Sequence, residues 1–212
     1  ALPISKGDGT DAGTWTIDEV PQSEYTDKVK ASYKEYNDAA IVVFSRSCGE
    51  GADLPRNMDR FGGGSESYLE LNQDEKDLLT AVKEAGFKKT IVILHSANPM
   101  QMDFLKDDYG IDSVLWVAGT GAGDGGIKAL CEIIAGDANP SGRLVDTYCY
   151  DNFSSPAMAN FGDFRYVDST GNPTGYSYIN YAEGIYIGYK YYETRYEDKV
   201  LGQGNTSDYQ YS

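Results

Sequence analysis

A glutamate flanked by glycines is the residue whose type and setting best suit acid–base chemistry in this chain. Glu50 stands between Gly49 and Gly51, shortly after an apolar run at 40–44. A carboxylic acid can protonate a leaving oxygen if partial burial or a neighbouring acid raises its pKa. Asp53, three residues on, could supply that charge or brace the loop. A solvated surface glutamate is the alternative, and this stretch alone leaves both interpretations open.

Glycoside hydrolysis is one reaction that such an acid could serve. It needs two carboxyl groups, which stand about 5–5.5 Å apart when the configuration of the sugar is retained. Glu50 is the only convincing candidate that the sequence offers.

The single histidine, His95, ends another apolar run, beside Ser96. A seryl hydrolase would need an acid partner and an exposed nucleophile turn, and no G-x-S-x-G motif exists in the sequence. A hydrogen-bonding structural histidine is therefore favoured, with substrate contact as the alternative.

The glycines of residues 121–126 match the pattern G-x-G-x-x-G, and Asp146 follows about twenty residues later, as in a dinucleotide fingerprint. The pattern follows the third predicted strand, however, and Asp124 would crowd a pyrophosphate. Tight packing of a helix on a sheet explains these glycines better, and nucleotide binding is the weaker alternative.

Charge and composition disfavour several kinds of partner. The net charge of −15 argues against nucleic acid and an anionic membrane surface, because phosphate binding needs clustered Lys and Arg. No run approaches the roughly 18 apolar residues of a membrane span. The three cysteines form neither a CxxC pair nor an even disulfide set, so a metal site is not expected. No cofactor is expected either. The compartment is left open.

The elements that would position these side chains alternate between strand and helix. Apolar runs of strand length predict strands at 40–45, 90–95 and 111–117, the first of them covered on both faces and the second buried. Helices are predicted at 26–37, 72–85, 100–107 and 124–135. This alternation predicts an α/β fold, a three-layer sandwich with a mostly parallel sheet flanked by helices. Ligands collect at the carboxyl ends of parallel strands, and Glu50 follows such an end.

The pattern changes beyond Asn139. Residues 139–144 are predicted to form a turn into a short strand, and residues 150–182 are loop-like. The alternation in 185–194 predicts a late edge or antiparallel strand. The chain is thus divided into a leader or loop segment, one α/β-sandwich domain and a polar tail, at 1–25, 26–198 and 199–212.

Taken together, these stretches resemble the α/β-sandwich, C-terminal-type domain of family 3 glycoside hydrolases, the β-glucosidase-like enzymes. The matching segments occur in family order over most of residues 39–194. The most specific are GEGAD at 49–53, the GxNPSGRL-like segment at 136–144 and EGIYIGY at 183–189.

The resemblance implies a site shared between two domains. In that family a (β/α)8 barrel of the same protein supplies an aspartate nucleophile, and this domain lends a glutamate general acid/base. That glutamate falls in the GEGxD-like loop, which puts it at Glu50. Residues that would contact the substrate or support the site are Arg46, Asp53, His95 and Asn98.

The expected substrate is a β-linked glucoside or oligosaccharide, with the sugar and the linkage left open. Neither the barrel nor the family's closing FGxGLSYT-like segment is found in these 212 residues. The chain by itself is therefore expected to hydrolyse little or nothing. The alternative is a non-catalytic module of such an enzyme, which only braces the barrel or binds carbohydrate.

Overall fold

The structure, a computed structural model, describes residues 19–46, 54–58, 67–121, 123–160, 164–204 and 206. They fall into two compact units, residues 1–143 and residues 144–212. None of the described helices is long and apolar enough to cross a membrane.

The first unit contains a three-stranded parallel sheet in the order β1-β2-β3. Its strands are β1 (Ala40–Arg46), β2 (Thr90–Ser96) and β3 (Ser113–Trp116). All three strands predicted from apolar runs are therefore confirmed. Arg46 is in register with Ser96, so β1 and β2 end at the same edge of the sheet.

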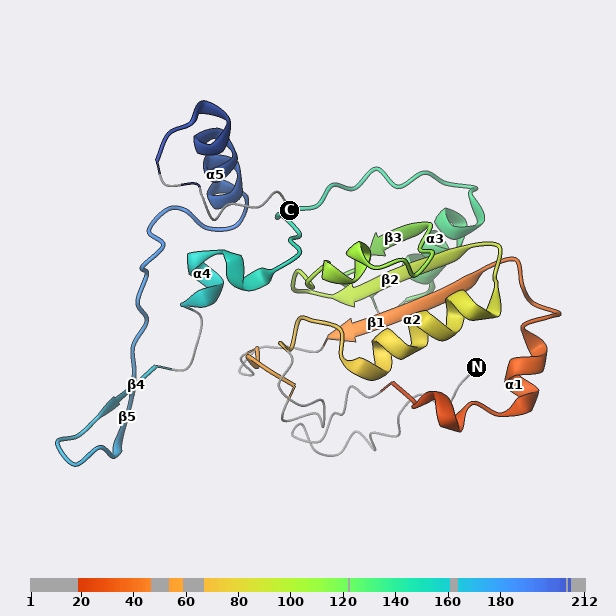
Figure 1. Cartoon of the computed structure of the whole chain (residues 1–212), viewed down its shortest axis with the longest axis horizontal. Coiled ribbons are helices and arrows are strands. Elements are labelled where there is room, and N and C mark those ends of the chain that lie inside the picture. Colours follow the sequence, from red (N-terminus) through yellow and green to blue (C-terminus); the bar gives the residue numbers. More distant parts are fainter. Residues whose placement is uncertain are drawn as a thin grey trace. The chain divides into compact units, whose positions relative to one another are not determined.

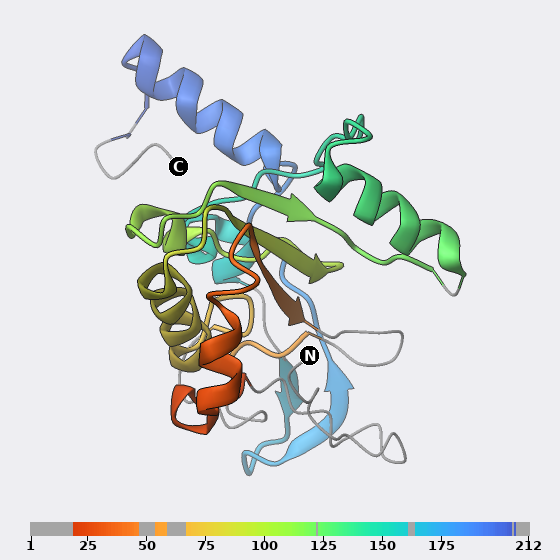
Figure 2. The ribbon, with the colours of Figure 1, turned by 90° about the vertical axis from the view of Figure 1, so that its right-hand side faces the viewer.

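Helices lie on both sides of this sheet. In Figures 1 and 2, α2 (Gln73–Ala85) lies against one face, and α3 (Asp124–Ala135) lies on the other side. The predicted α/β sandwich is confirmed. Shorter pieces are η1 (Gln22–Glu24), α1 (Asp27–Ser32) and η3 (Asp103–Lys106). The helix predicted at 26–37 is shorter than expected, because residues 33–35 form a turn instead.

The core lies on the α2 side of the sheet. Val42 and Phe44 of β1 are buried, together with Leu79 of α2. Burial alternates along β1, as the two-residue period of a strand requires. Ile41 and Val43 are 50% and 51% exposed, so the prediction that β1 is covered on both faces was wrong. β1 is an edge strand of the three-stranded sheet, and its second face keeps half of its apolar surface open.

The second unit has two short helical pieces, a hairpin and a longer helix. They are η4 (Asn152–Ser154), α4 (Pro156–Ala159), the antiparallel pair β4 (Arg165–Val167) and β5 (Pro173–Ser177), and α5 (Tyr189–Leu201). Antiparallel pairing is present, but in a separate two-stranded sheet and not at the edge of the parallel one.

Two predicted strands of this region were wrong. Residues 141–144 form no strand, and the stretch predicted as a strand at 185–194 runs into α5. Gly188, with φ 52°, takes a backbone conformation that favours glycine and immediately precedes the helix. Tyr192 is the buried residue of α5, so the apolar alternation of this stretch does not reflect a strand with one buried face.

Candidate active site

Three of the five predicted site residues lie at the carboxyl edge of the parallel sheet. Arg46 ends β1, His95 is the penultimate residue of β2, and Asn98 follows that strand. The other two, Glu50 and Asp53, lie outside the described residues. The described part of the site is therefore its framework at the ends of β1 and β2.

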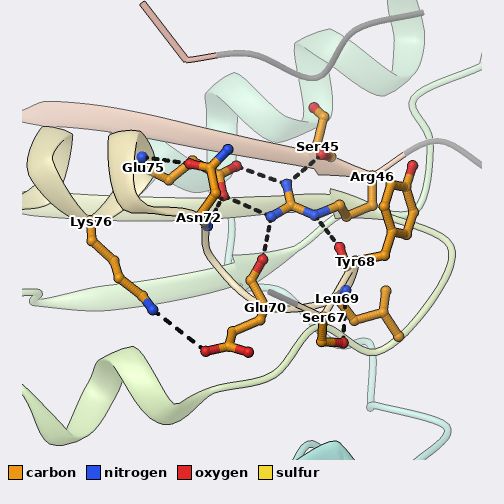
Figure 3. A network of polar contacts seen from close by, with 9 residues as sticks. All are labelled: Ser45, Arg46, Ser67, Tyr68, Leu69, Glu70, Asn72, Glu75 and Lys76. Carbon is orange, nitrogen blue, oxygen red and sulfur yellow. Dashed lines mark hydrogen bonds and ion pairs between the residues drawn. The ribbon is translucent and has the colours of Figure 1, made fainter. Parts of the chain in front are cut away.

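Arg46 is the most constrained side chain of this edge, and only 1% of its side chain is exposed. Its Nε donates to the carbonyl oxygen of Tyr68 at 2.6 Å. Its Nη1 donates to the carbonyl of Ser45 at 2.8 Å, and its Nη2 to that of Glu70 at 2.6 Å (Figure 3). Two further bonds reach the carboxylate of Glu75, so the bonds number five, as many as a guanidinium has N–H groups.

Glu75 receives Arg46 in a bidentate pair, with both N···O distances at 2.7 Å. The Glu75 side chain is 4% exposed. Its Oε2 also accepts from the backbone N–H of Asn72, while the Asn72 side chain accepts from the backbone N–H of Glu75, both at 2.9 Å. This is a capping box, which satisfies free amides at the start of α2. The buried charge of Arg46 is thus compensated from the first turn of that helix.

Two of the three carbonyls held by Arg46 belong to residues 22 and 24 positions further along the chain. The Tyr68 ring also lies 5.9 Å from the guanidinium carbon, within the range of a cation–π contact. Tyr68 is fully buried, as is Met58 from the preceding described piece. That piece is joined to the same region by a bridge between Asn57 and Ser67. Arg46 therefore ties the end of β1 to the segment that leads into α2.

His95 faces solvent beside β1. Its Nδ1 lies 3.5 Å from the hydroxyl of Ser45, its partner in the strand register, which is the outer limit of a hydrogen bond. Ser96, the sequence neighbour of His95, is engaged elsewhere: its hydroxyl donates to the carbonyl of Asn98 and accepts from the Asn98 backbone N–H. Ser96 closes the turn after β2.

Two residues of this framework were missed by the sequence interpretation. Glu75 was placed inside the helix predicted at 72–85 but was not identified as the partner of Arg46. An arginine at the end of an apolar strand was the available signal, because a buried guanidinium requires a carboxylate. Trp116 at the end of β3 donates from its indole Nε1 to the carbonyl of Ser96 at 2.7 Å. That bond fixes the neighbouring strand end.

The glycines before α3 have a structural explanation. A Cβ added to Gly126 would lie 2.0 Å from the carbonyl oxygen of Thr120, so only glycine fits there without movement of the backbone. Gly125, its neighbour in the helix, has no atom near such a Cβ. The close approach of helix to loop accounts for Gly126 without a nucleotide.

Within the described ranges, no group of three or more His, Cys, Asp or Glu side chains is arranged to hold a metal ion. What the sheet edge presents is a rigid anchor of buried charges, with the exposed imidazole of His95 beside the Ser45 hydroxyl. The anchor holds the backbone on which a reactive side chain could be carried.

This chain is similar in sequence to known proteins. The model of the glycosyl hydrolase family 3 C-terminal domain matches residues 7–189. A β-glucosidase of Ruminococcus albus is 32% identical over 200 residues, which are 93% of this chain and 18% of the relative. β-Glucosidase A of Butyrivibrio fibrisolvens is 30% identical over 78% of this chain and 20% of its own length.

Solved structures agree. A β-glucosidase from Paenibacillus barengoltzii superposes with a TM-score of 0.64 at 28% identity, over 84% of this chain and 17% of that one. β-Glucosidase 3B from Thermotoga neapolitana, in complex with α-D-glucose, gives 0.60 at 28% identity, over 83% of this chain and 22% of that one. The chain thus spans about a fifth of the length of these proteins. It belongs to the family of glycosyl hydrolase family 3 C-terminal domains.

Proposed function

We propose that this chain is the domain of a retaining β-glycosidase that contributes Glu50 as general acid/base to a site shared with a (β/α)8 barrel of the same protein. The observation that carries the proposal is the position of the GEGAD motif. It begins three residues after Arg46, the anchored end of β1 in a parallel sheet. Strand ends of this kind are where α/β sheets bind their ligands. The named relatives are β-glucosidases, which supports a β-linked glucoside as the substrate.

The proposed reaction proceeds in two steps. In the first, the nucleophilic carboxylate from the barrel attacks the anomeric carbon while Glu50 transfers its proton to the departing glycosidic oxygen, which leaves as an alcohol. This gives a glycosyl ester on the nucleophile. In the second, the Glu50 carboxylate takes a proton from water, whose oxygen attacks the anomeric carbon and releases the nucleophile. Glu50 ends the cycle protonated again.

Replacing Glu50 by alanine in the full-length glycosidase tests this role. Cleavage of substrates with poor leaving groups depends on protonation, so their kcat/KM should fall by about 10²–10⁴-fold. The kcat/KM of an activated aryl glucoside reports the first step, which needs no proton, and should be spared. Its kcat should fall, because water attacks the glycosyl ester without a general base. Added azide should restore turnover of that activated substrate, because azide attacks the glycosyl ester without a general base.

The control is Glu84→Ala, the same substitution at an exposed position of α2. It should behave as the wild type with both substrates. If Glu50→Ala also leaves the ratio of the two activities unchanged, the domain is a module that braces the barrel or binds carbohydrate, and the catalytic proposal fails.

A further inference from the structure

We propose that Arg46 is a positioning residue for the acid/base, holding in place the end of β1, which lies four residues before Glu50 in the sequence. This role rests on the proposed function of Glu50. It is carried by the five hydrogen bonds of a buried guanidinium, three of which go to main-chain carbonyls.

The burial and the bonds of Arg46 argue against direct contact between its side chain and a substrate. Its side chain is 1% exposed, and the protein engages as many bonds as the guanidinium has N–H donors. A sugar hydroxyl could bind only by displacing one of these partners. Any effect of Arg46 on the reaction must therefore act through the groups that it holds.

The groups that it holds lie on both sides of the stretch 47–66. Before it stands the carbonyl of Ser45, and after it stand the carbonyls of Tyr68 and Glu70. One planar guanidinium thus binds carbonyls on both sides of the stretch, which ties its two ends to each other (Figure 3). Glu50 is four residues from Arg46, within about 14 Å at 3.3–3.6 Å per residue.

The anchor has a rigid support. Glu75 holds the far side of the guanidinium and at the same time belongs to the capping box of α2. Leu79, one turn further along that helix, is fully buried. A reactive group needs such support, because a displacement of about 1 Å can lower the rate by about 100-fold.

Lysine cannot replace arginine here, although it keeps the charge. An ammonium has three donors around one point, whereas the fork of Arg46 spans two carboxylate oxygens and three carbonyls. Arg46→Lys therefore keeps a cation beside Glu75 and loses the two separate N–H donors that bind the carbonyls of Tyr68 and Glu70. This variant therefore distinguishes the effect of positioning the backbone from the effect of compensating the charge of Glu75.

The experiment measures leaving-group dependence in the full-length glycosidase, for the wild type and for Arg46→Lys. The expected result is a loss of about 10- to 100-fold in kcat/KM for a poor leaving group, and a much smaller loss for an activated aryl glucoside. A merely structural role would lower both activities by the same factor, through the fraction of folded enzyme. The ratio of the two activities thus reports the placement of the acid and not stability.

Glu75→Gln is the second variant, for use if Arg46→Lys does not fold. It keeps the shape of the carboxylate but weakens its hydrogen bonds to the guanidinium. The ratio of the two activities should shift in the same direction as in Arg46→Lys. Lys88→Gln is the matched control, because Lys88 belongs to an exposed ion pair with Asp38. Its ratio should equal that of the wild type.

The outcomes are distinguishable. A shifted ratio in both Glu50→Ala and Arg46→Lys supports the inference. A shifted ratio in Glu50→Ala with a wild-type ratio in Arg46→Lys, or in its substitute Glu75→Gln, overturns the role of Arg46 alone. A wild-type ratio in Glu50→Ala overturns the proposed function and the role of Arg46 with it.

Discussion

Arg46 is a buried charge at the end of β1, and its contacts are those of a compensated guanidinium. Burying a charge is unfavourable unless hydrogen bonds and an opposite charge compensate it. Here the compensation comes from Glu75 and from backbone carbonyls, so the ion pair is also a junction of three chain segments. Removing either Arg46 or Glu75 should therefore lower the free energy of unfolding as well as the enzymatic activity.

Glu75→Ala should lower the free energy of unfolding of this chain by about 3–5 kcal/mol, because it leaves the Arg46 charge buried without its partner. It also removes the acceptor for the Asn72 backbone N–H. Urea denaturation followed by circular dichroism would measure the change. Asp38→Ala, which breaks an exposed ion pair with Lys88, is the control and should have little effect. Equal midpoints for the two variants would contradict the geometry.

A second prediction at the scale of single residues concerns the thiols. Cys149 is buried, its Sγ donates to the side-chain oxygen of Asn152, and it accepts from the Tyr192 hydroxyl. Burial raises the pKa of the Cys149 thiol above its usual value. The folded state therefore retains this proton, and the stability gained is present below the ordinary thiol pKa and is lost as pH rises through the raised one.

Iodoacetamide should accordingly modify Cys149 far more slowly than Cys131, which is exposed. The rate at Cys149 should start to rise only at a higher pH than an ordinary thiol requires. Mass spectrometry of peptides from a pH series would give both rates from one sample. Equal rates at pH 8 would show that the second unit does not enclose Cys149.

Local patterns determined the elements that could be predicted. The strands at 40–46 and 90–96 each contain a continuous apolar run, and α2 starts with a capping box and ends with a left-handed glycine, Gly86. These signals depend only on neighbouring residues. The element that was mistaken, α5, has mostly exposed side chains, so burial imposed no period on its sequence. The exposure of the second face of β1 could not be predicted either, since the burial of a strand face depends on elements that are distant in the sequence.

The close contact of Gly126 with the Thr120 carbonyl leads to a testable prediction about the start of α3. Gly126→Ala should destabilise the chain by about 1–3 kcal/mol, because its methyl group would collide with the Thr120 carbonyl. Gly125→Ala, the adjacent position with no nearby atom, should be neutral or stabilising by up to about 1 kcal/mol. Thermal denaturation of both variants would compare them. A clear saturable signal in a nucleotide titration would contradict the packing explanation.

For the candidate site, motifs select some residues, whereas others become visible only in the fold. The resemblance of GEGAD to a family motif selected Glu50, whereas the partner of Arg46 required the fold, since it lies 29 residues away. No local signal in these 212 residues marks a second carboxyl group, and the relatives are about five times as long as the chain.

At the scale of the whole molecule, the expectation is that this chain alone shows no turnover of an aryl β-glucoside. Retaining hydrolysis needs two carboxyl groups about 5–5.5 Å apart, and the proposed function places only the acid/base on this chain. Purified chain should give a blank in a sensitive fluorogenic assay while remaining folded by circular dichroism. Turnover should return when the acid/base is covalently joined to its barrel in the full-length glycosidase. Robust hydrolysis by the isolated chain, abolished by Glu50→Ala, would place both carboxyl groups within these residues and contradict the shared site.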